Sequence, residues 1–206
     1  MTMRGPTAAD LQSTFGRQVE TLAKRVKSYN SADWGAASAN PDWTNADVVA
    51  HLVGLLESFC QGVELRAEPI RPPFGEEAKR PADAALSLAL SDVGERLEEL
   101  LRGTQPTDLV WHPRYRFSAR TMAALALAEA VLHRWDVTGP GDRGPEPRAA
   151  RLVLQGLFPS RDDSGASPVA LLLHLTGRAR IEGRPGWKGD DWRYELPDEI
   201  TADRAE

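Results

Sequence analysis

Residues 118–138 have the sequence SARTMAALALAEAVLHRWDVT, which predicts one long helix. Ser118 is a typical N-cap residue, because its hydroxyl can accept a hydrogen bond from a free N–H of the first turn, and a Gly-Pro-Gly sequence follows as a stop. Glu129 and His133 share one face of this helix with Leu125, so an acid and an imidazole point into the core. Burying an unpaired carboxylate is costly, so this face needs a partner for the charge.

Three further segments carry a helical pattern. Their apolar residues recur at spacings of three and four, which places one apolar stripe along each helix. Thr7 and Thr44 begin two of them as N-caps, and Pro81 suits the first turn of the third. The expected helices are residues 7–30, 44–66 and 81–103. Four stripes of similar length favour a mainly α fold, a four-helix bundle, in which polar sites lie where helices face each other.

The rest of the chain predicts loops and a small C-terminal α+β extension. Residues 69–81 are rich in Pro and predict a loop that could act as a lid, while residues 107–117 predict either a small hairpin or an extended crossing. Helices are expected at 147–158 and 168–176, and strand-like pieces at 178–182 and 192–196. We therefore expect two parts, a bundle at residues 1–140 and a short α+β region at residues 147–206 that packs on it.

Composition and charge argue against several classes of protein. The 206 residues include 25 Lys and Arg and 30 Asp and Glu, well interspersed, and this net charge of −5 argues against nucleic acid as a partner. The sequence contains neither a basic amphipathic stretch nor a run of 18 apolar residues, so no membrane contact is expected. The single cysteine and the lack of an apolar leader favour a cytosolic protein.

A divalent metal ion would explain the polar residues on the buried faces. Glu129 and His133 are one helical turn apart, so both can reach the same ion, and His51, on the apolar stripe of the second helix, adds a third ligand. Two imidazoles and one carboxylate leave coordination positions open, which is typical of a catalytic site. Asp136 could accept a hydrogen bond from an imidazole N–H behind the ion, or take part in capping the helix. The alternative is that Glu129 and His133 form a charged pair and that His51 is a core histidine.

Two motifs resemble signatures of a known family. Residues 43–52, WTNADVVAHL, resemble the Trp-x-x-x-Asp-x-x-x-His-Leu signature of the mycothiol-dependent maleylpyruvate isomerase family. Residues 128–136, AEAVLHRWD, resemble the second signature of that family, Glu-x-x-x-His-x-x-Asp. A third stretch, LLLHLTGR at 171–178, is similar to a motif of its C-terminal region. The likeness therefore extends over most of the chain.

The resemblance implies a DinB-like four-helix bundle that holds a divalent ion through His51, Glu129 and His133. Zinc is the first candidate, with nickel or manganese as alternatives. It also implies mycothiol as a thiol cofactor, and a small electrophilic or dicarboxylate substrate that is isomerised or receives the thiol. Residues 147–206 are fewer than we expect of a complete C-terminal domain in this family. A non-catalytic metal- or ligand-binding regulatory module and a structural protein with a vestigial site therefore stay open as alternatives.

Three residues are candidates for binding the substrate. An anionic thiol or a dicarboxylate favours arginine, which points to Arg134 and Arg120, and His112 lies just before the fourth helix. The alternative for each is an ordinary surface or loop position. Cys60 is expected to be a buried, unreactive thiol, and Trp43 is expected to pack at the start of the second helix. We expect a monomer or a homodimer.

Overall fold

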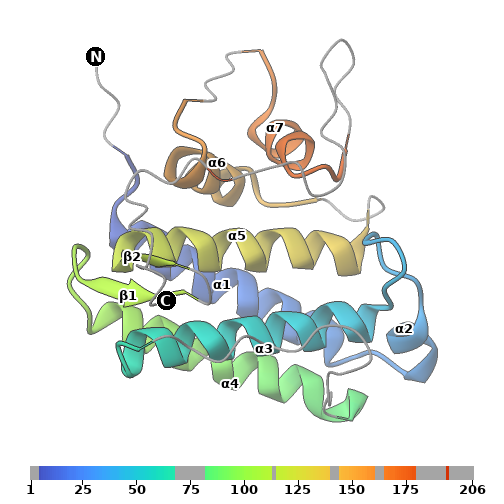
Figure 1. Ribbon diagram of the computed structural model, residues 1–206. Helices are drawn as coiled ribbons and strands as arrows, with labels where there is room; N and C mark the ends of the chain where they lie inside the picture. Colours follow the sequence, from blue (N-terminus) through green and yellow to red (C-terminus); the bar gives the residue numbers. More distant parts are fainter. Residues whose placement is uncertain are drawn as a thin grey trace, which may run out of the picture.

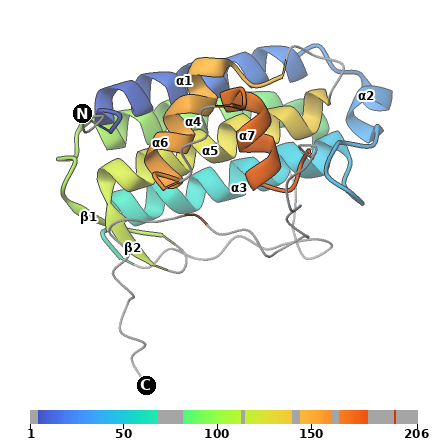
Figure 2. The same ribbon diagram turned by 90° about the horizontal axis from the view of Figure 1, so that it is seen from above.

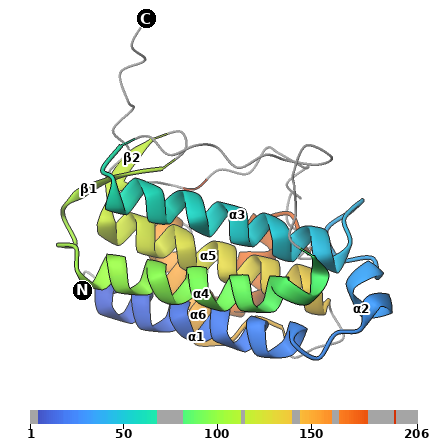
Figure 3. The same ribbon diagram turned by 90° about the horizontal axis from the view of Figure 1, so that it is seen from below.

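The structure is a computed structural model and is described for residues 5–67, 82–112, 115–139, 144–160, 165–179 and 194. Four long helices form a bundle in which each helix contacts two others, in the cyclic order α1, α4, α3, α5 (Figures 1 and 3). Their bounds are Ala8–Val26 for α1, Asn45–Glu64 for α3, Asp83–Arg102 for α4 and Ala119–Thr138 for α5. The predicted mainly α, four-helix bundle is confirmed.

Helix α5 is the centre of the molecule. It contacts α1, α3, both strands and α6 (Pro147–Leu157), and most of its side chains are buried. Many of these side chains are alanines, which allow neighbouring helices to approach closely. A Cβ placed on Gly156 of α6 would lie 3.0 Å from the Cβ of Ala124. Helix α6 and its neighbour α7 (Pro168–Leu175) therefore form a layer over α5, on the side away from α3 and α4 (Figures 1 and 2).

The first helix ends earlier than its pattern predicts. Helix α1 ends at Val26, and a separate short helix α2 (Ser31–Gly35) follows. Asn30 is the N-cap of α2, because its side chain accepts hydrogen bonds from the first turn while the Asp33 side chain accepts one from the Asn30 N–H. This capping box fixes the corner between the two helices, and the buried Trp34 ring packs on Tyr29 there, with ring centroids 5.3 Å apart.

The segment before α5 forms a hairpin, one of the two alternatives that its sequence left open. Strand β1 (Leu109–Trp111) pairs antiparallel with β2 (Arg116–Ser118). The backbone of β1 lies against α3, where a Cβ on Gly62 would be 1.8 Å from the carbonyl oxygen of Trp111. Gly62 is therefore required by close contact between backbones.

We expect Gly62→Ala to destabilise the protein by about 1–3 kcal/mol, because the added methyl group meets the backbone of β1 and forces it to move. A glycine inside a helix normally gains about 1 kcal/mol on replacement by alanine, so the sign is reversed here. The free energy of unfolding in denaturant measures the effect. Gly35→Ala is the control, since nothing lies within 4 Å of its Cβ position, and it should change stability by less than about 0.5 kcal/mol. Equal effects of the two substitutions would contradict the proposed close contact.

Helix α3 is long and apolar enough to cross a membrane by those two criteria, the one such helix in the described part of the chain. However, 56% of that apolar stretch is buried inside the bundle, as in the core helix of a globular fold. The expected lid at residues 69–81 and most of the two strand-like pieces (178–182 and 192–196) lie outside the described residues.

Candidate functional site

Three polar side chains lie side by side on α5. Glu129, His133 and Asp136 are about one helical turn apart, and the helix brings them into direct contact. The Nε2 atom of His133 is 3.2 Å from Glu129 Oε2, and its Nδ1 atom is 3.0 Å from Asp136 Oδ2. The side chains are 19% exposed for Glu129, 7% for His133 and 1% for Asp136. The imidazole is thus held between two carboxylates inside the protein.

This arrangement calls for a positive charge at His133 Nε2. Because the Asp136 carboxylate only accepts, the Nδ1 atom must donate to it, and a neutral ring then turns its Nε2 lone pair toward Glu129. Two acceptors 3.2 Å apart repel each other unless a proton or a metal cation lies between them. Burial alone would lower the pKa of His133, but hydrogen bonds with Asp136 and Glu129 raise it above its ordinary value. Burial would raise the pKa of both carboxyl groups, but their interactions with His133 lower them.

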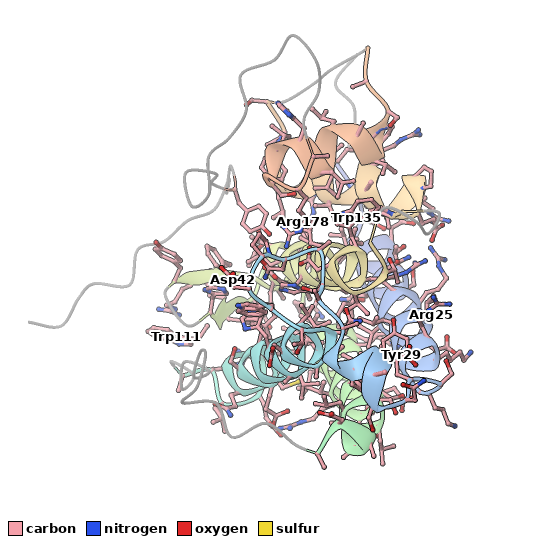
Figure 4. All side chains as sticks on the ribbon, turned by 90° about the vertical axis from the view of Figure 1, so that its right-hand side faces the viewer. Arg25, Tyr29, Asp42, Trp111, Trp135 and Arg178 are labelled. Carbon is pink, nitrogen blue, oxygen red and sulfur yellow. The ribbon has the colours of Figure 1, made fainter. Side chains whose placement is uncertain are left out.

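Asp136 is fixed by an arginine from a distant part of the chain. Arg178, just after α7, donates from Nε to Asp136 Oδ1 and from Nη2 to Asp136 Oδ2, both at 2.8 Å. Figure 4 shows Arg178 between α7 and α5. This two-point contact fixes the plane of the carboxylate, which in turn fixes the ring of His133. Arg178 was not predicted as a site residue from the sequence, although it lies in the third motif, at 171–178.

His51 approaches the cluster from α3. Its ring centroid is 5.2 Å from that of His133, and the two planes are 84° apart. His51 also packs in a T-shaped arrangement with Trp43, with ring centroids 5.1 Å apart. Burial, followed by the charge of His133, lowers the pKa of His51 to about 4, so its ring is neutral at pH 7. Trp43 packs at the start of α3, as expected, and it also lies against a residue of the site.

Tyr194, in the C-terminal part of the chain, also contacts Glu129. The hydroxyl of Tyr194 donates to Glu129 Oε1 at 3.5 Å, at the outer limit of a hydrogen bond. Burial raises the pKa of Tyr194 well above its ordinary value, so the phenol is a proton donor at neutral pH. No sequence pattern connects Tyr194 with α5, because 65 residues separate it from Glu129.

Two of the three proposed ligands, Glu129 and His133, have donor atoms whose type and spacing fit a divalent ion. No group of three or more His, Cys, Asp and Glu side chains in the described ranges is already arranged as a metal site, and His133 Nε2 faces Glu129 directly. Two ligand atoms about 2.0–2.1 Å from a tetrahedral zinc lie about 3.3 Å from each other. The observed separation of Glu129 Oε2 and His133 Nε2 is 3.2 Å. An ion could therefore replace the proton between them with little movement of either side chain.

Comparison with known proteins gives this site its context. Residues 15–138 match the family described as the mycothiol maleylpyruvate isomerase N-terminal domain, which is more than half of the chain. The protein belongs to this family. The resemblance stated from the sequence motifs is thus confirmed. No curated protein is similar enough in sequence to count as a relative.

Solved structures of the mycothiol-dependent maleylpyruvate isomerase share the fold of this family member. The chain in one crystal structure is 15% identical in sequence. Its TM-score is 0.67, and the alignment covers 90% of this chain and 100% of that chain. A histidine-to-alanine variant of that enzyme is 13% identical, with a TM-score of 0.64 and the same coverage. The alignment takes in the whole of those chains, and the expectation of a short C-terminal region stays a prediction.

The two candidate arginines lie near opposite ends of α5. Arg134 follows His133 in the chain, but its guanidinium donates to the side chain of Gln18 on α1 at 2.9 Å. Arg120 is exposed on the first turn, with its guanidinium beside Gly5. It lies nine residues before Glu129, which is about 13 Å along the helix axis. A role for either in binding substrate stays a prediction.

His112 lies in a cluster of aromatic rings. Its ring centroid is 5.3 Å from that of Phe59 and 5.6 Å from that of Phe117, and Tyr115 stacks nearby. This places it next to the β-hairpin. Its predicted contact with a substrate is not tested by this geometry.

Proposed function

We propose that this protein is a divalent-metal-dependent enzyme that uses a low-molecular-weight thiol, with mycothiol as the first candidate. The reaction would be cis–trans isomerisation of a small electrophile, or transfer of the thiol to it. The observation that carries this proposal is the pair of donor atoms at 3.2 Å on Glu129 and His133, with the His51 ring facing them from α3. Membership of the mycothiol maleylpyruvate isomerase family supports the choice of thiol.

Three residues would hold the ion, and two others would orient one of them. His51, Glu129 and His133 would be the ligands, while Asp136 and Arg178 keep Nδ1 of His133 occupied, so that its Nε2 lone pair is directed at the metal position. A bound zinc, nickel or manganese ion would lower the pKa of a coordinated thiol, so that the nucleophilic thiolate exists at neutral pH.

The protein's own thiol is unsuited to this chemistry, which favours an external one. Cys60 is fully buried, with its sulfur 3.9 Å from the carbonyl oxygen of Val93, and burial raises its pKa to about 12. An external thiol supplies reversible addition to an activated carbon–carbon double bond, which permits rotation about the resulting single bond and consumes no oxidant or reductant. In this cluster His133 and Asp136 are buried, whereas His51 and Glu129 are partly exposed.

We expect the Cys60 thiol to be unreactive in the folded protein, because its thiolate fraction at pH 7 is negligible and its sulfur is inaccessible. Labelling with a maleimide should be slower than that of free cysteine by more than about 100-fold, and denaturant should restore the rate. Cys60→Ala should keep the thiol-dependent activity. Loss of turnover in a Cys60→Ala variant that is still folded would show that Cys60 takes part in the reaction.

The proposed function is tested by metal content and by turnover together. Purified protein should contain close to one equivalent of a divalent ion. Added mycothiol should support isomerisation or thiol transfer on a panel of small cis-enedioic acids and other electrophiles, and a chelator should abolish this turnover. Tight ligand binding without turnover would favour a regulatory binding module instead. Protein that binds no metal under any condition would exclude the proposed enzyme.

A further inference from the structure

The two carboxylates beside His133 are each approached by one donor from the chain beyond α7. Arg178 holds Asp136 through two hydrogen bonds of 2.8 Å. Tyr194 reaches Glu129 on the other side of the imidazole. Both residues lie outside the segment that matches the family, residues 15–138. The C-terminal part therefore contributes to the surroundings of both carboxylates on α5.

The tyrosine contacts a specific oxygen of Glu129. Its hydroxyl faces Oε1, whereas Oε2 is the atom that lies 3.2 Å from His133 Nε2. The Glu129 carboxylate can rotate about its Cγ–Cδ bond, which changes the direction in which both oxygens point. A donor on Oε1 favours the rotamer in which Oε2 is directed toward the position shared with His133.

The ring of Tyr194 packs against Phe158, the C-cap residue of α6. Its centroid is 5.5 Å from that of Phe158, which is 3% exposed and belongs to the core. The tyrosine ring itself packs against the core as a partly buried side chain. The hydroxyl is therefore presented to Glu129 from a fixed support, which limits the entropy lost when the hydrogen bond forms.

We propose that Tyr194 is a positioning residue for Glu129, which holds Oε1 so that Oε2 is oriented as a ligand for the divalent ion. This inference rests on the proposed metal-dependent function. It assigns to the C-terminal part a second contribution to the site, besides the Arg178 contact with Asp136. Removal of the phenol oxygen alone should weaken metal binding and leave the metal-free fold as it is.

The test compares two variants of the full chain that each lose one phenol oxygen. Tyr194→Phe removes the donor to Glu129, and Tyr29→Phe removes a hydroxyl in the corner between α1 and α2, next to Trp34. The Zn²⁺ dissociation constant is measured by competition with a chelator, and the unfolding midpoint of the metal-free protein is measured in parallel. We expect Tyr194→Phe to weaken Zn²⁺ binding about tenfold, the lower end of the effect of losing a residue behind a metal ligand. The unfolding midpoint should not change, and Tyr29→Phe should bind Zn²⁺ as the unmodified protein does.

The possible outcomes separate this inference from the proposed function. If the unmodified protein binds Zn²⁺ and Tyr194→Phe binds it equally well, the inference is wrong and the metal site stands. A weaker affinity accompanied by an equal loss of stability in the metal-free protein would show a structural role, and would also overturn it. If the unmodified protein binds no divalent ion, the proposed function fails and the inference fails with it.

Discussion

Replacing His133 with alanine is expected to abolish specific metal binding and thiol-dependent turnover. His133 offers the Nε2 atom that lies 3.2 Å from Glu129 Oε2, and its ring is in contact with that of His51. Loss of a residue behind a metal ligand already weakens metal binding by about 10–100-fold, so loss of the ligand itself should weaken it by more than about 100-fold. Chelator competition and elemental analysis measure the affinity and the stoichiometry, and an assay with mycothiol measures turnover.

His174→Ala is the control for this substitution. His174 is a buried histidine on α7, only 4% exposed, so its removal should lower stability without removing a proposed ligand. The folded fraction of that variant should still bind about one equivalent of metal. If His133→Ala binds metal as tightly as the unmodified protein, the ligand set is wrong.

Replacing Arg178 with methionine is expected to cost about 3–5 kcal/mol of stability, the usual result of removing one partner of a buried ion pair. The Asp136 side chain is 1% exposed and that of Arg178 is 17% exposed, so solvent screens this pair very little. The pKa of Asp136 lies below its ordinary value, since burial raises it less than His133 and Arg178 lower it. Removal of the guanidinium takes away two of the interactions that lower this pKa and leaves His133 as the partner of the carboxylate. Equilibrium unfolding in urea measures the loss.

Two further variants separate the charge from its geometry. Arg178→Lys keeps a positive charge but loses the two-point contact. Its free energy of unfolding should therefore lie between those of the methionine variant and the unmodified protein. In the double variant Asp136→Asn with Arg178→Met, the buried negative charge is gone and His133 Nδ1 still has an acceptor, so part of the stability should return. A loss below about 1 kcal/mol in Arg178→Met would mean that the ion pair contributes little.

The local parts of this fold were predictable from the sequence. The caps Thr7, Thr44 and Ser118 all begin helices, because a side-chain hydroxyl can satisfy a free N–H wherever the apolar stripe starts. The short helix α2 was missed, because five residues give no periodicity. The signal for it was the capping pair Asn30 and Asp33, which requires no stripe.

Helical spacing alone predicts the part of the site that lies on α5, while His51 was predicted from the apolar stripe of α3 and the family resemblance. Glu129, His133 and Asp136 are neighbours on one helix, so their contact follows from the 3.6-residue repeat. Arg178 and Tyr194 are 42 and 65 residues away from the carboxylates they contact, and the packing of the C-terminal part decides those contacts.

Arg134 shows how the side chains of neighbouring residues diverge on a helix. It follows His133 directly, yet it faces Gln18 on α1, because consecutive residues of a helix are rotated by about 100°. Closeness in sequence to a site residue therefore says little about which side of α5 a side chain serves.

The most direct measurement is a crystal structure of the metal-loaded protein, with anomalous data collected on both sides of the absorption edge of the bound metal. We expect one anomalous peak about 2.0–2.2 Å from Glu129 Oε2, His133 Nε2 and a ring nitrogen of His51, with at least one coordination position left open. A peak elsewhere on the molecule, or a Glu129–His133 contact that persists in saturating metal with no ion between α3 and α5, would contradict the proposed metal site.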